Sequence, residues 1–575
     1  MDLEKLEKEF EQDGPHVVEK LYRWASMKPD QKFLYYGEED RTLTYREFNQ
    51  LTNKIGRSLQ SLGAGQGDRI SLYLFNPLVT VLAMFGIWKI GAVFSPINFN
   101  YKGRLLSYQI NDTGPKLMIT EQALLPFLNN VKEEFPPLKI IVRKPGPGEH
   151  DFNPGFDPLE LDKKFQGLDF DDLFQNDSSD LKTEIQYWDT ANIIYTSGTT
   201  GPAKGVVQSH RWMAQYTFNT RRITHPDDVI YNDLPMYHVG GAISNFTRAV
   251  WVGANAALWD KFSPGEFWKR IEAGGANNAT LLDVMIPWLM NAPETPKDRH
   301  NGLKWVHMQP LPQYHHKVAK RFGIDFVTGG YGQTEAGNGF VGLIDELEEG
   351  EGTPSELYKG FSREETREFC RKWGYPLLSG KDVIKKGFMG RSIVLTPAVL
   401  NEHDEELGPG QYGQLAFRSR LPFCMLDGYF NKPEATVEVF RNQWFHTGDA
   451  CYKDQNEVYF FVDRMGGFIR TRGENISSYQ IEDIINSHPA VEFCAAFPIP
   501  AAEGEEDDIV VYITLRQKME LEEKALRKWL ASEMPKFMWP RHIRFIDELP
   551  RTPTNKVEKY KLKKLIMEEL KGVSG

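Results

Sequence analysis

The residues from Thr196 to Gly205 read TSGTTGPAKG and follow an apolar run at 191–195. Glycines let the backbone approach an anion closely, hydroxyls and free N–H groups can surround phosphate oxygens, and a lysine adds positive charge. The pattern predicts a phosphate site, against the alternative of a flexible surface turn. A P-loop is excluded, because Ala203 stands where its second glycine belongs and Gly205 follows Lys204. The residues expected to bind phosphate are Thr196, Ser197, Gly198, Thr199, Thr200, Gly201 and Lys204.

Five further segments carry short polar motifs. They are YGQTE at 331–335, HTGD at 446–449, DR at 463–464, RTRGENI at 470–476 and PRTPTNKV at 550–557. Taken alone, the first two are typical of ordinary turns. Together with the glycine-rich loop, and in this order, the motifs resemble those of the adenylate-forming superfamily, which includes acyl-CoA synthetases, firefly-type luciferases and the adenylation domains of peptide synthetases. The resemblance spans nearly the whole chain.

The resemblance implies an ATP site with Mg²⁺. Tyr331 would lie against the adenine, since an aromatic face stacks on a purine. Thr334 would bond the α-phosphate, and Glu335 would hold Mg²⁺ together with Thr196, since a carboxylate is a hard oxygen ligand. Other residues expected near the nucleotide are Gly332, Gln333, Gln309 and Pro310. The last two lie in MQPL at 308–311, where the family usually has a Gly-Gly-Ala-Pro-like segment.

The resemblance also assigns roles near the C-terminus. Asp449 would accept hydrogen bonds from both ribose hydroxyls, and Arg464 would reach the ribose or the phosphate. Lys556 would be the catalytic lysine. A coenzyme A loop would contain Arg470, Gly473, Glu474 and Asn475. In the segment PMYHVG at 235–240, His238 would border the acyl pocket, although a lone histidine is more often a packed one.

The activity that these motifs imply is an AMP-forming acyl-CoA synthetase. It would convert a carboxylic acid and ATP into an acyl-adenylate and then transfer the acyl group to coenzyme A. Two alternatives stay open: loading of a carrier protein, and a binding protein that has lost the chemistry. The hinge departs from the family, with MGG at 465–467 in place of a charged residue, and Asn555 replaces the usual glycine.

The acid itself is not determined by the sequence. The segment RTRGENISSYQIE resembles bacterial crotonobetaine/carnitine-CoA-ligase-like members. Aromatic residues near the expected pocket could form a cage for a quaternary ammonium group. Ordinary core packing is the favoured alternative for them. These residues are Trp212, Phe218, Tyr237, Phe246, Trp251 and Phe340.

Helical and strand patterns alternate around these motifs. Thr44 and Glu47 form a capping-box pattern before a helix that we expect to reach Gly63, and strands are expected near 70–74 and 91–94. This rhythm predicts an α/β fold with a mostly parallel sheet. With the resemblance, we expect a large N-terminal domain of stacked α/β sheets with a small β-barrel-like subdomain (1–463), followed by a small mobile α+β domain (464–575).

Two stretches are expected to depart from the compact fold. Residues 144–180 are rich in Pro, Gly, Asp and Asn, and we interpret them as a surface excursion. Residues 345–386 begin with the acidic run DELEEGE and resemble an insertion, with a helix near 362–373. The acidic run itself is interpreted as a solvated face.

Composition sets outer limits on function. The 575 residues carry 68 Lys+Arg and 79 Asp+Glu, a net charge of −11, which disfavours nucleic acid as a partner. The four cysteines form no C-x-x-C pair, so we expect reduced thiols in a cytoplasmic protein. The apolar stretch 78–88 is shorter than the ~20 residues of a membrane span and predicts a buried helix. The oligomeric state stays open, a homodimer included.

Overall fold

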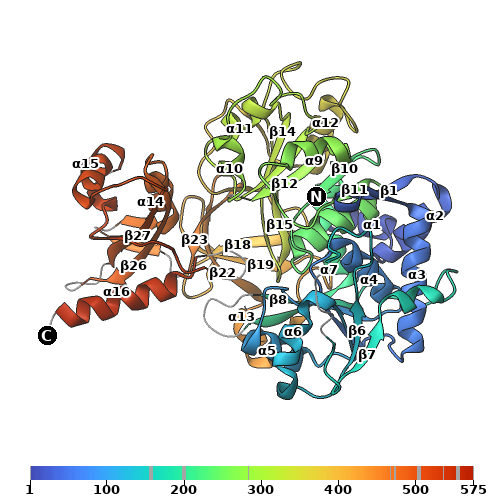
Figure 1. The fold of residues 1–575 in the computed structure, drawn as a ribbon. Helices are drawn as coiled ribbons and strands as arrows, with labels where there is room; N and C mark the ends of the chain where they lie inside the picture. Colours follow the sequence, from blue (N-terminus) through green and yellow to red (C-terminus); the bar gives the residue numbers. More distant parts are fainter. Residues whose placement is uncertain are drawn as a thin grey trace.

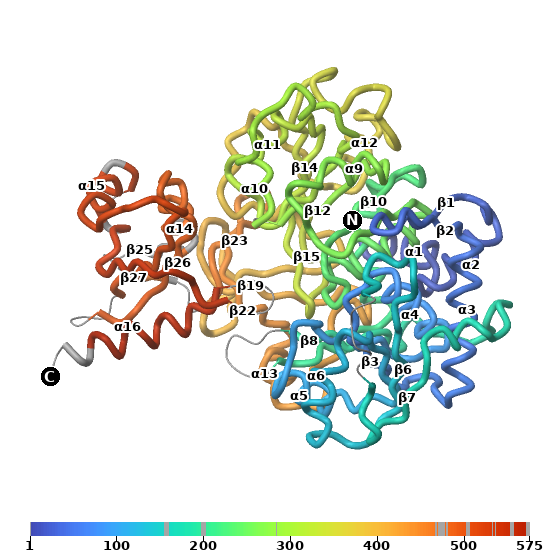
Figure 2. The backbone as a smooth tube through the Cα atoms, in the orientation of Figure 1, coloured from blue at the N-terminus to red at the C-terminus, as the bar shows by residue number. Residues whose placement is uncertain are grey.

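A computed structural model describes residues 2–153, 160–196, 203–282, 284–465, 468–471, 474–501, 507–534, 536–551 and 557–573. A large body of stacked sheets and helices is followed by a smaller C-terminal unit, which stands to one side of it (Figure 1). The same separation is visible in the backbone trace (Figure 2). The predicted α/β class is confirmed.

The first sheet has nine strands and is mostly parallel. Its order is β16 (Leu377–Ser379), β15 (Gly337–Asp345), β14 (Phe326–Gln333), β13 (Trp305–Gln309), β12 (Asn278–Leu282), β10 (Val229–Asn232), β11 (Asn255–Leu258), β1 (Lys32–Tyr36) and β2 (Arg41–Thr44).

The second sheet has eight strands, of which six are parallel. Its order is β20 (Gly428–Tyr429), β9 (Lys204–Ser209), β8 (Thr190–Thr196), β4 (Val93–Pro96), β3 (Arg69–Tyr73), β5 (Leu117–Glu121), β6 (Lys139–Arg143) and β7 (Gln166–Asp169). The third sheet is antiparallel and is the barrel-like part. It contains β17 (Phe388–Gly390), β23 (Tyr459–Arg464), β22 (Trp444–Lys453), β19 (Gly413–Ser419) and β18 (Leu395–Leu400), with β21 (Phe440–Arg441) beside β22.

The helices of the large body cover these sheets. They are α1 (Leu3–Asp13), α2 (Val17–Met27), α3 (Tyr45–Ser61), α4 (Pro77–Lys89), α5 (Gly103–Thr113), α6 (Leu125–Asn130), α7 (His210–Arg221), α8 (Arg248–Val252), α9 (Phe267–Gly274), α10 (Ile286–Asn291), α11 (His315–Phe322), α12 (Arg363–Trp373) and α13 (Pro433–Val439), with short 3-10 turns such as η1 (Gly37–Glu39). Among the described residues, no helix is both long enough and apolar enough to cross a membrane.

Helices α3 and α4 confirm two predictions about the core. The predicted capping box is present at the start of α3, where Thr44 and Glu47 bond each other's backbone. Every residue of α4 is buried. The two helices approach closely at Gly56 and Gly86, where a Cβ on Gly56 would lie 3.1 Å from the carbonyl oxygen of Gly86. Larger residues there would push the helices apart.

The C-terminal unit has its own apolar core. It contains β24 (Phe468–Thr471), β25 (Glu474–Ser477), α14 (Ser478–Asn486), β26 (Val491–Pro500), β27 (Asp507–Leu515), α15 (Glu523–Glu533), β28 (His542–Phe545) and α16 (Lys559–Val573). The unit is bonded to the large body at Asp463 of β23, whose carboxylate accepts hydrogen bonds from the backbone N–H and the hydroxyl of Ser478, at 2.9 and 2.6 Å.

The two predicted departures are only partly right. Residues 144–180 do not stay outside the sheet, because they return as β7, which pairs in parallel with β6. The predicted helix near 362–373 is confirmed as α12, with Ser362 as its N-cap. The solvated-face interpretation of the acidic run is wrong for its first residues. Glu346 is buried between His315 and His316, and Asp345 contacts arginines.

Arg363 explains why this end of the acidic run turns inward. Its guanidinium lies 3.0 Å from Asp325 and also binds Asp345, and its side chain is only 11% exposed. Arg367 holds the other oxygen of Asp345 at 2.6 Å. The buried arginine therefore ties α12 to the end of β15.

We predict that Arg363→Met destabilises the large body by about 3–5 kcal/mol, since it leaves the buried Asp325 without its cation. The thermal unfolding midpoint of the intact chain measures the effect. Lys381→Met is the matched control, because Lys381 and its partner Glu348 are 70% and 65% exposed and solvent screens such a pair, so a much smaller shift is expected. Equal shifts for the two variants would contradict the assigned role of Arg363.

Candidate functional site

Asp449 is the point where two sheets meet through polar side chains. It lies in β22 of the barrel-like sheet and is 4% exposed. One of its oxygens accepts hydrogen bonds from the hydroxyl of Tyr331 at 2.6 Å and from the amide nitrogen of Gln333 at 2.8 Å. Both donors lie at the end of β14 in the nine-stranded sheet. Two of the predicted site residues, 118 positions apart in the chain, are thus brought into contact.

The second oxygen of Asp449 faces Arg464. The two residues are paired across β22 and β23, and the arginine Nε lies 3.8 Å from the carboxylate. The Arg464 side chain is 55% exposed, so it can turn toward a ligand at the surface. The adjacent Gly448 has a φ of +74°, a conformation that suits glycine. Burial, and then the nearby Asp449, raise the pKa of Tyr331 well above its ordinary value, so its hydroxyl stays a donor.

Thr334 and Glu335 follow β14 directly and are fixed through their backbone carbonyls. The Gln208 side chain donates to the carbonyl of Thr334 at 2.9 Å. The carbonyl of Glu335 accepts from the Trp212 indole at 3.3 Å and from the Leu426 N–H at 2.8 Å. These bonds hold the two residues against β9, α7 and the residues just before β20.

The Glu335 carboxylate lies beside Tyr429, whose ring in turn contacts Lys204. The Tyr429 hydroxyl donates to it at 3.0 Å, and the Lys204 ammonium lies over the Tyr429 ring, 4.9 Å from its centroid. Burial raises the pKa of Glu335, and the hydrogen bond from Tyr429 acts in the opposite direction. Burial makes the charged form of this carboxylate costly, so the position suits a divalent cation that would compensate the charge.

The structure gives fewer contacts for the residues at the edges of the site. Thr196 ends β8, and its hydroxyl lies 3.5 Å from the carbonyl oxygen of Lys204. Gln309 is the last residue of β13, and Pro310 follows it. Strand β13 pairs with β14 up to His307, opposite Thr328. Gly332 pairs with Asn338. His238 is exposed rather than packed, and its Nδ1 accepts from the Gly240 N–H at 3.2 Å.

Several predicted site residues lie outside what the structure describes. These residues are Ser197, Gly198, Thr199, Thr200, Gly201, Gly473 and Lys556. For Arg470, Glu474 and Asn475, only the backbone is described, in β24 and β25.

The aromatic residues considered for a cage have different ring partners. Trp212 contacts Tyr216, and Phe218 is stacked on Phe10 with centroids 5.1 Å apart. The remaining contacts place Phe246 against Phe33, Phe48 and Phe85, Phe340 against Tyr331 and Phe417, and Tyr237 against Phe99. Of the six, all but Tyr237 are buried in the core. Core packing, the favoured alternative, describes these residues.

Two residues of the site were not found from the sequence. Gln208 holds Thr334, and Tyr429 binds Glu335. Tyr429 lies in β20, a strand of two residues that pairs with β9, opposite Val206. So short a strand has no detectable periodicity, and only the loop-rich composition around it marks the region.

Comparisons with known proteins cover most of the chain. The family model described as AMP-binding enzyme matches residues 21–430, and the model of the AMP-binding enzyme C-terminal domain matches residues 480–556. A crotonobetaine/carnitine–CoA ligase of Salmonella arizonae is 26% identical over 559 residues, which cover 96% of this chain and 99% of that protein. Its counterpart in Salmonella agona is 27% identical over 529 residues, covering 91% and 93%.

Solved structures show the same fold. The ATP-bound MatB of Rhodopseudomonas palustris has a TM-score of 0.75 at 20% identity and covers 96% of this chain and 99% of its own. The anthranilate CoA ligase AuaEII, in complex with anthranoyl-AMP, has a TM-score of 0.77 at 20% identity, covering 96% and 98%. At this identity the likeness concerns the fold.

We predict that Tyr429→Phe moves the pH dependence of Mg²⁺-dependent ATP binding to higher pH. The change removes the hydrogen bond that favours the charged form of Glu335, so the pKa of that carboxyl rises further. A cation must then displace a proton from Glu335 over a wider range of pH. Calorimetric titrations between pH 5 and 9 measure the shift. Tyr412→Phe, at an exposed ring of the barrel-like sheet, is the control. An unshifted profile would show that Tyr429 does not act on Glu335.

Proposed function

The chain belongs to the AMP-binding enzyme family, and from this premise we propose that it is an ATP-dependent acid–thiol ligase. It activates a carboxylic acid as an acyl-adenylate and then transfers the acyl group to coenzyme A. The observation that carries the proposal is the pair of polar centres at the two ends of the segment 331–335. One is formed at Asp449, and the other at Glu335, which binds Tyr429, with Lys204 over the Tyr429 ring.

The centre at Asp449 suits the nucleoside end of ATP. A buried carboxylate can accept hydrogen bonds from both ribose hydroxyls, and Tyr331 and Gln333 fix its orientation. Within the described part of the chain, the side-chain oxygen of Gln333 is buried without a hydrogen-bond partner. Such an orphaned acceptor beside Asp449 fits a donor supplied by a ligand. Arg464 is placed to reach the same ligand.

The centre at Glu335 suits the phosphate end. Mg²⁺ bound by Glu335, with Thr196 as the second proposed ligand, would neutralise phosphate charge. Thr334 would bond the α-phosphate, and Lys204 would lie beside the glycine-rich loop that begins after Thr196. The buried carboxylate and the hydroxyl fit a hard cation, because both offer oxygen ligands.

Adenylation solves a chemical difficulty of thioester formation. A carboxylate does not react with a thiol directly, since hydroxide or oxide is a poor leaving group. Attack of the carboxylate on the α-phosphorus of ATP releases pyrophosphate and gives an acyl-adenylate, from which the thiol of coenzyme A displaces AMP. Such phosphoryl chemistry asks a protein mainly for positioning and charge stabilisation. Lys556 is the proposed residue that bridges the carboxylate and the α-phosphate.

We further propose that residues 1–463 and 464–575 form two units that rotate about 464–467. One orientation would present Lys556, and the other would present the loop containing Arg470, Gly473, Glu474 and Asn475 to coenzyme A. Asp463 lies in β23 of the first unit and accepts hydrogen bonds from Ser478 of the second, so rotation about 464–467 would break these bonds. A salt bridge between Lys386 and Asp483, at 3.5 Å, is one contact that rotation would break.

The acid substrate is proposed only as a class. Relatives named crotonobetaine/carnitine–CoA ligase make betaine acids the first to test, although the aromatic residues near the expected pocket form no cage. His238 is proposed to border the acyl pocket. A cytoplasmic location is part of the proposal, because all four cysteines are buried free thiols.

Product analysis with purified protein tests the activity. We expect ATP, Mg²⁺, coenzyme A and a panel of betaine, short-chain, aromatic and fatty acids to give AMP, pyrophosphate and a free acyl-CoA with at least one acid. Mass spectrometry identifies the thioester. Adenylate without acyl-CoA would favour carrier-protein loading instead. Absence of ATP–pyrophosphate exchange with every acid would favour a binding protein.

Lys556→Ala separates the two half-reactions. We expect acyl-adenylate formation to fall by about 10²–10³, the usual cost of losing one charge-stabilising donor. Transfer from a supplied acyl-adenylate to coenzyme A should remain within a few fold. Lys561→Ala is the control, because that lysine is half-exposed and paired with Glu558. Equal loss of both half-reactions would contradict the two-orientation proposal.

A further inference from the structure

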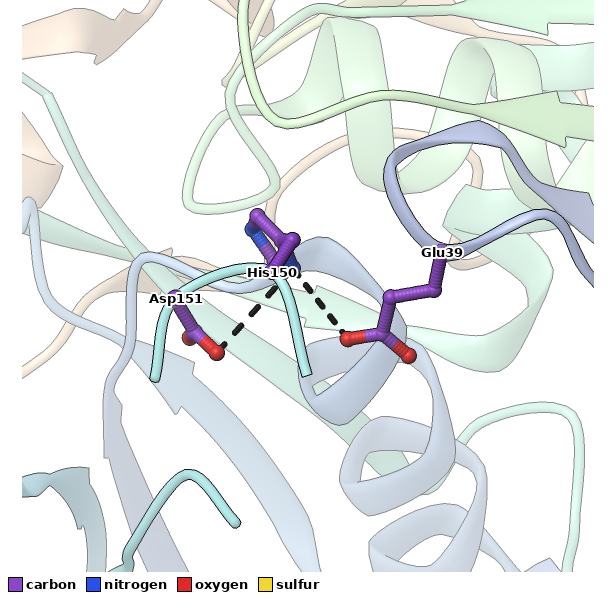
Figure 3. A group of neighbouring side chains, drawn as sticks. All are labelled: Glu39, His150 and Asp151. Carbon is purple, nitrogen blue, oxygen red and sulfur yellow. Dashed lines mark hydrogen bonds and ion pairs between the residues drawn. The ribbon is translucent and has the colours of Figure 1, made fainter. Parts of the chain in front are cut away.

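A histidine lies among three carboxylates at a distance from the site already described. His150 and Asp151 belong to the loop after β6, and Glu39 belongs to η1, after β1. The Nδ1 of His150 is 3.1 Å from a Glu39 oxygen and 4.0 Å from an Asp151 oxygen (Figure 3). One ligand atom from each of the three residues lies within 4.8 Å of the other two. The three side chains therefore converge on one point.

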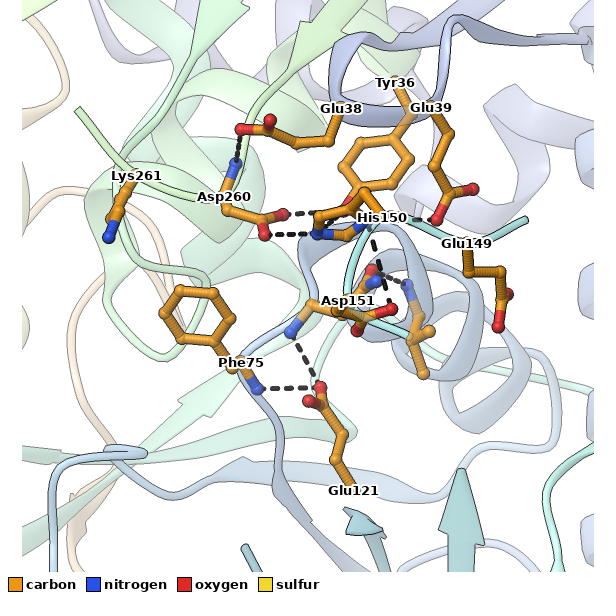
Figure 4. A network of polar contacts seen from close by, with 12 residues as sticks. Tyr36, Glu38, Glu39, Phe75, Glu121, Glu149, His150, Asp151, Asp260 and Lys261 are labelled. Carbon is orange, nitrogen blue, oxygen red and sulfur yellow. Dashed lines mark hydrogen bonds and ion pairs between the residues drawn. The ribbon is translucent and has the colours of Figure 1, made fainter. Parts of the chain in front are cut away.

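The opposite edge of the imidazole is fixed by a fourth residue. His150 Nε2 lies 2.7 Å from an oxygen of Asp260, whose other oxygen accepts from the Tyr36 hydroxyl at 2.6 Å (Figure 4). A carboxylate at this nitrogen favours the N–H form there and leaves the Nδ1 lone pair directed at Glu39 and Asp151. Metal-ligating histidines almost always have such an outer carboxylate or carbonyl, which orients the ring and raises its basicity.

The spacing of the three ligand atoms suits a small cation. Two ligand atoms that each lie about 2.0–2.2 Å from a tetrahedral zinc ion are about 3.3–3.6 Å from each other. The separations of 3.1 and 4.0 Å from Nδ1 lie on either side of this value. An imidazole nitrogen with two carboxylates favours a borderline transition metal over Mg²⁺ or Ca²⁺, which prefer oxygen ligands alone.

The site is accessible and negatively charged. The side chains of Glu39, His150 and Asp151 are 10%, 21% and 24% exposed, which leaves room for water as a further ligand. Arg143 binds both oxygens of Asp151. Among the described residues, the other cationic group near this carboxylate is His150. Each carboxylate oxygen has a second lone pair, so this pairing does not prevent ligation.

We propose that Glu39, His150 Nδ1 and Asp151 bind a divalent transition-metal ion of the Zn²⁺ class, with Asp260 and Tyr36 as its outer hydrogen-bonding partners. The ion cross-links the loop after β6, in the eight-stranded sheet, to the turn after β1, in the nine-stranded sheet. It is separate from the cation proposed at Glu335 and does not depend on the ligase activity.

The rival arrangement is a metal-free ion-pair cluster with a proton on the same nitrogen. The hydrogen bond to Asp260 raises the pKa of His150 to about 9, against the opposing effect of burial. A proton and a metal ion at Nδ1 exclude each other. Direct metal titration of the full chain therefore separates the two arrangements.

The test titrates the purified full-length protein, stripped of metal and free of ATP, with Zn²⁺ by calorimetry and with Co²⁺ by visible absorption. We expect saturable binding of one metal ion per chain, and visible absorption bands typical of a Co²⁺ ion of low coordination number. Glu39→Gln and His150→Ala should weaken binding at least tenfold, and Asp260→Asn should weaken it about 10–100-fold, as outer-partner changes do. Circular dichroism checks that each variant is folded, and Glu39→Gln keeps the size of the side chain.

Two variants serve as matched controls. His300→Ala removes a histidine that also faces a glutamate, at 3.9 Å, but is 64% exposed. Glu335→Gln alters the other proposed cation position. Both should bind Zn²⁺ as the wild type does. Absence of saturable Zn²⁺ or Co²⁺ binding to the wild type, or binding that His150→Ala and Glu39→Gln leave unchanged, would overturn the proposal in favour of the ion-pair cluster.

Discussion

The contact between Asp449 and the end of β14 is the interaction on which the rest of the site depends. It joins a strand of the barrel-like sheet to a strand of the nine-stranded sheet through two short hydrogen bonds. A carboxylate that is 4% exposed is stable only where donors or cations compensate its charge. Tyr331 and Gln333 provide this compensation, and Arg464 completes it from the neighbouring strand. The same groups that stabilise Asp449 fix its direction.

That contact also determines where Glu335 lies. Once Tyr331 and Gln333 are fixed, the chain leaves β14 toward the eight-stranded sheet, where Gln208 and Trp212 hold the next two carbonyls. Glu335 then faces Tyr429 and the end of β9. Five consecutive residues therefore contact all three large sheets of the body. The segment is therefore constrained at both of its ends.

The two stretches that the sequence predicted to depart from the compact fold are held to the large body by ion pairs. Arg363 joins α12 to Asp325 and Asp345, and the loop after β6 is joined to other segments through His150. In both cases, groups that look like solvated surface charges in the sequence are partly buried in pairs. A buried pair needs both partners, so each of these links is specific to its position.

The sequence by itself determined the α/β class, the capping box of α3, the buried helix α4 and the motifs at 331–335 and 446–449. These features depend on local patterns, and a local pattern is visible in the order of residues. Only the tertiary structure decided that Tyr331 and Gln333 bond Asp449, that Tyr429 bonds Glu335, and that the aromatic residues pack against different rings in the core. It also decided that residues 144–180 return to the sheet as β7 and that Asp345 turns inward. Each of these facts depends on which distant segments become neighbours, and the spacing of residues along one chain carries no direct record of that.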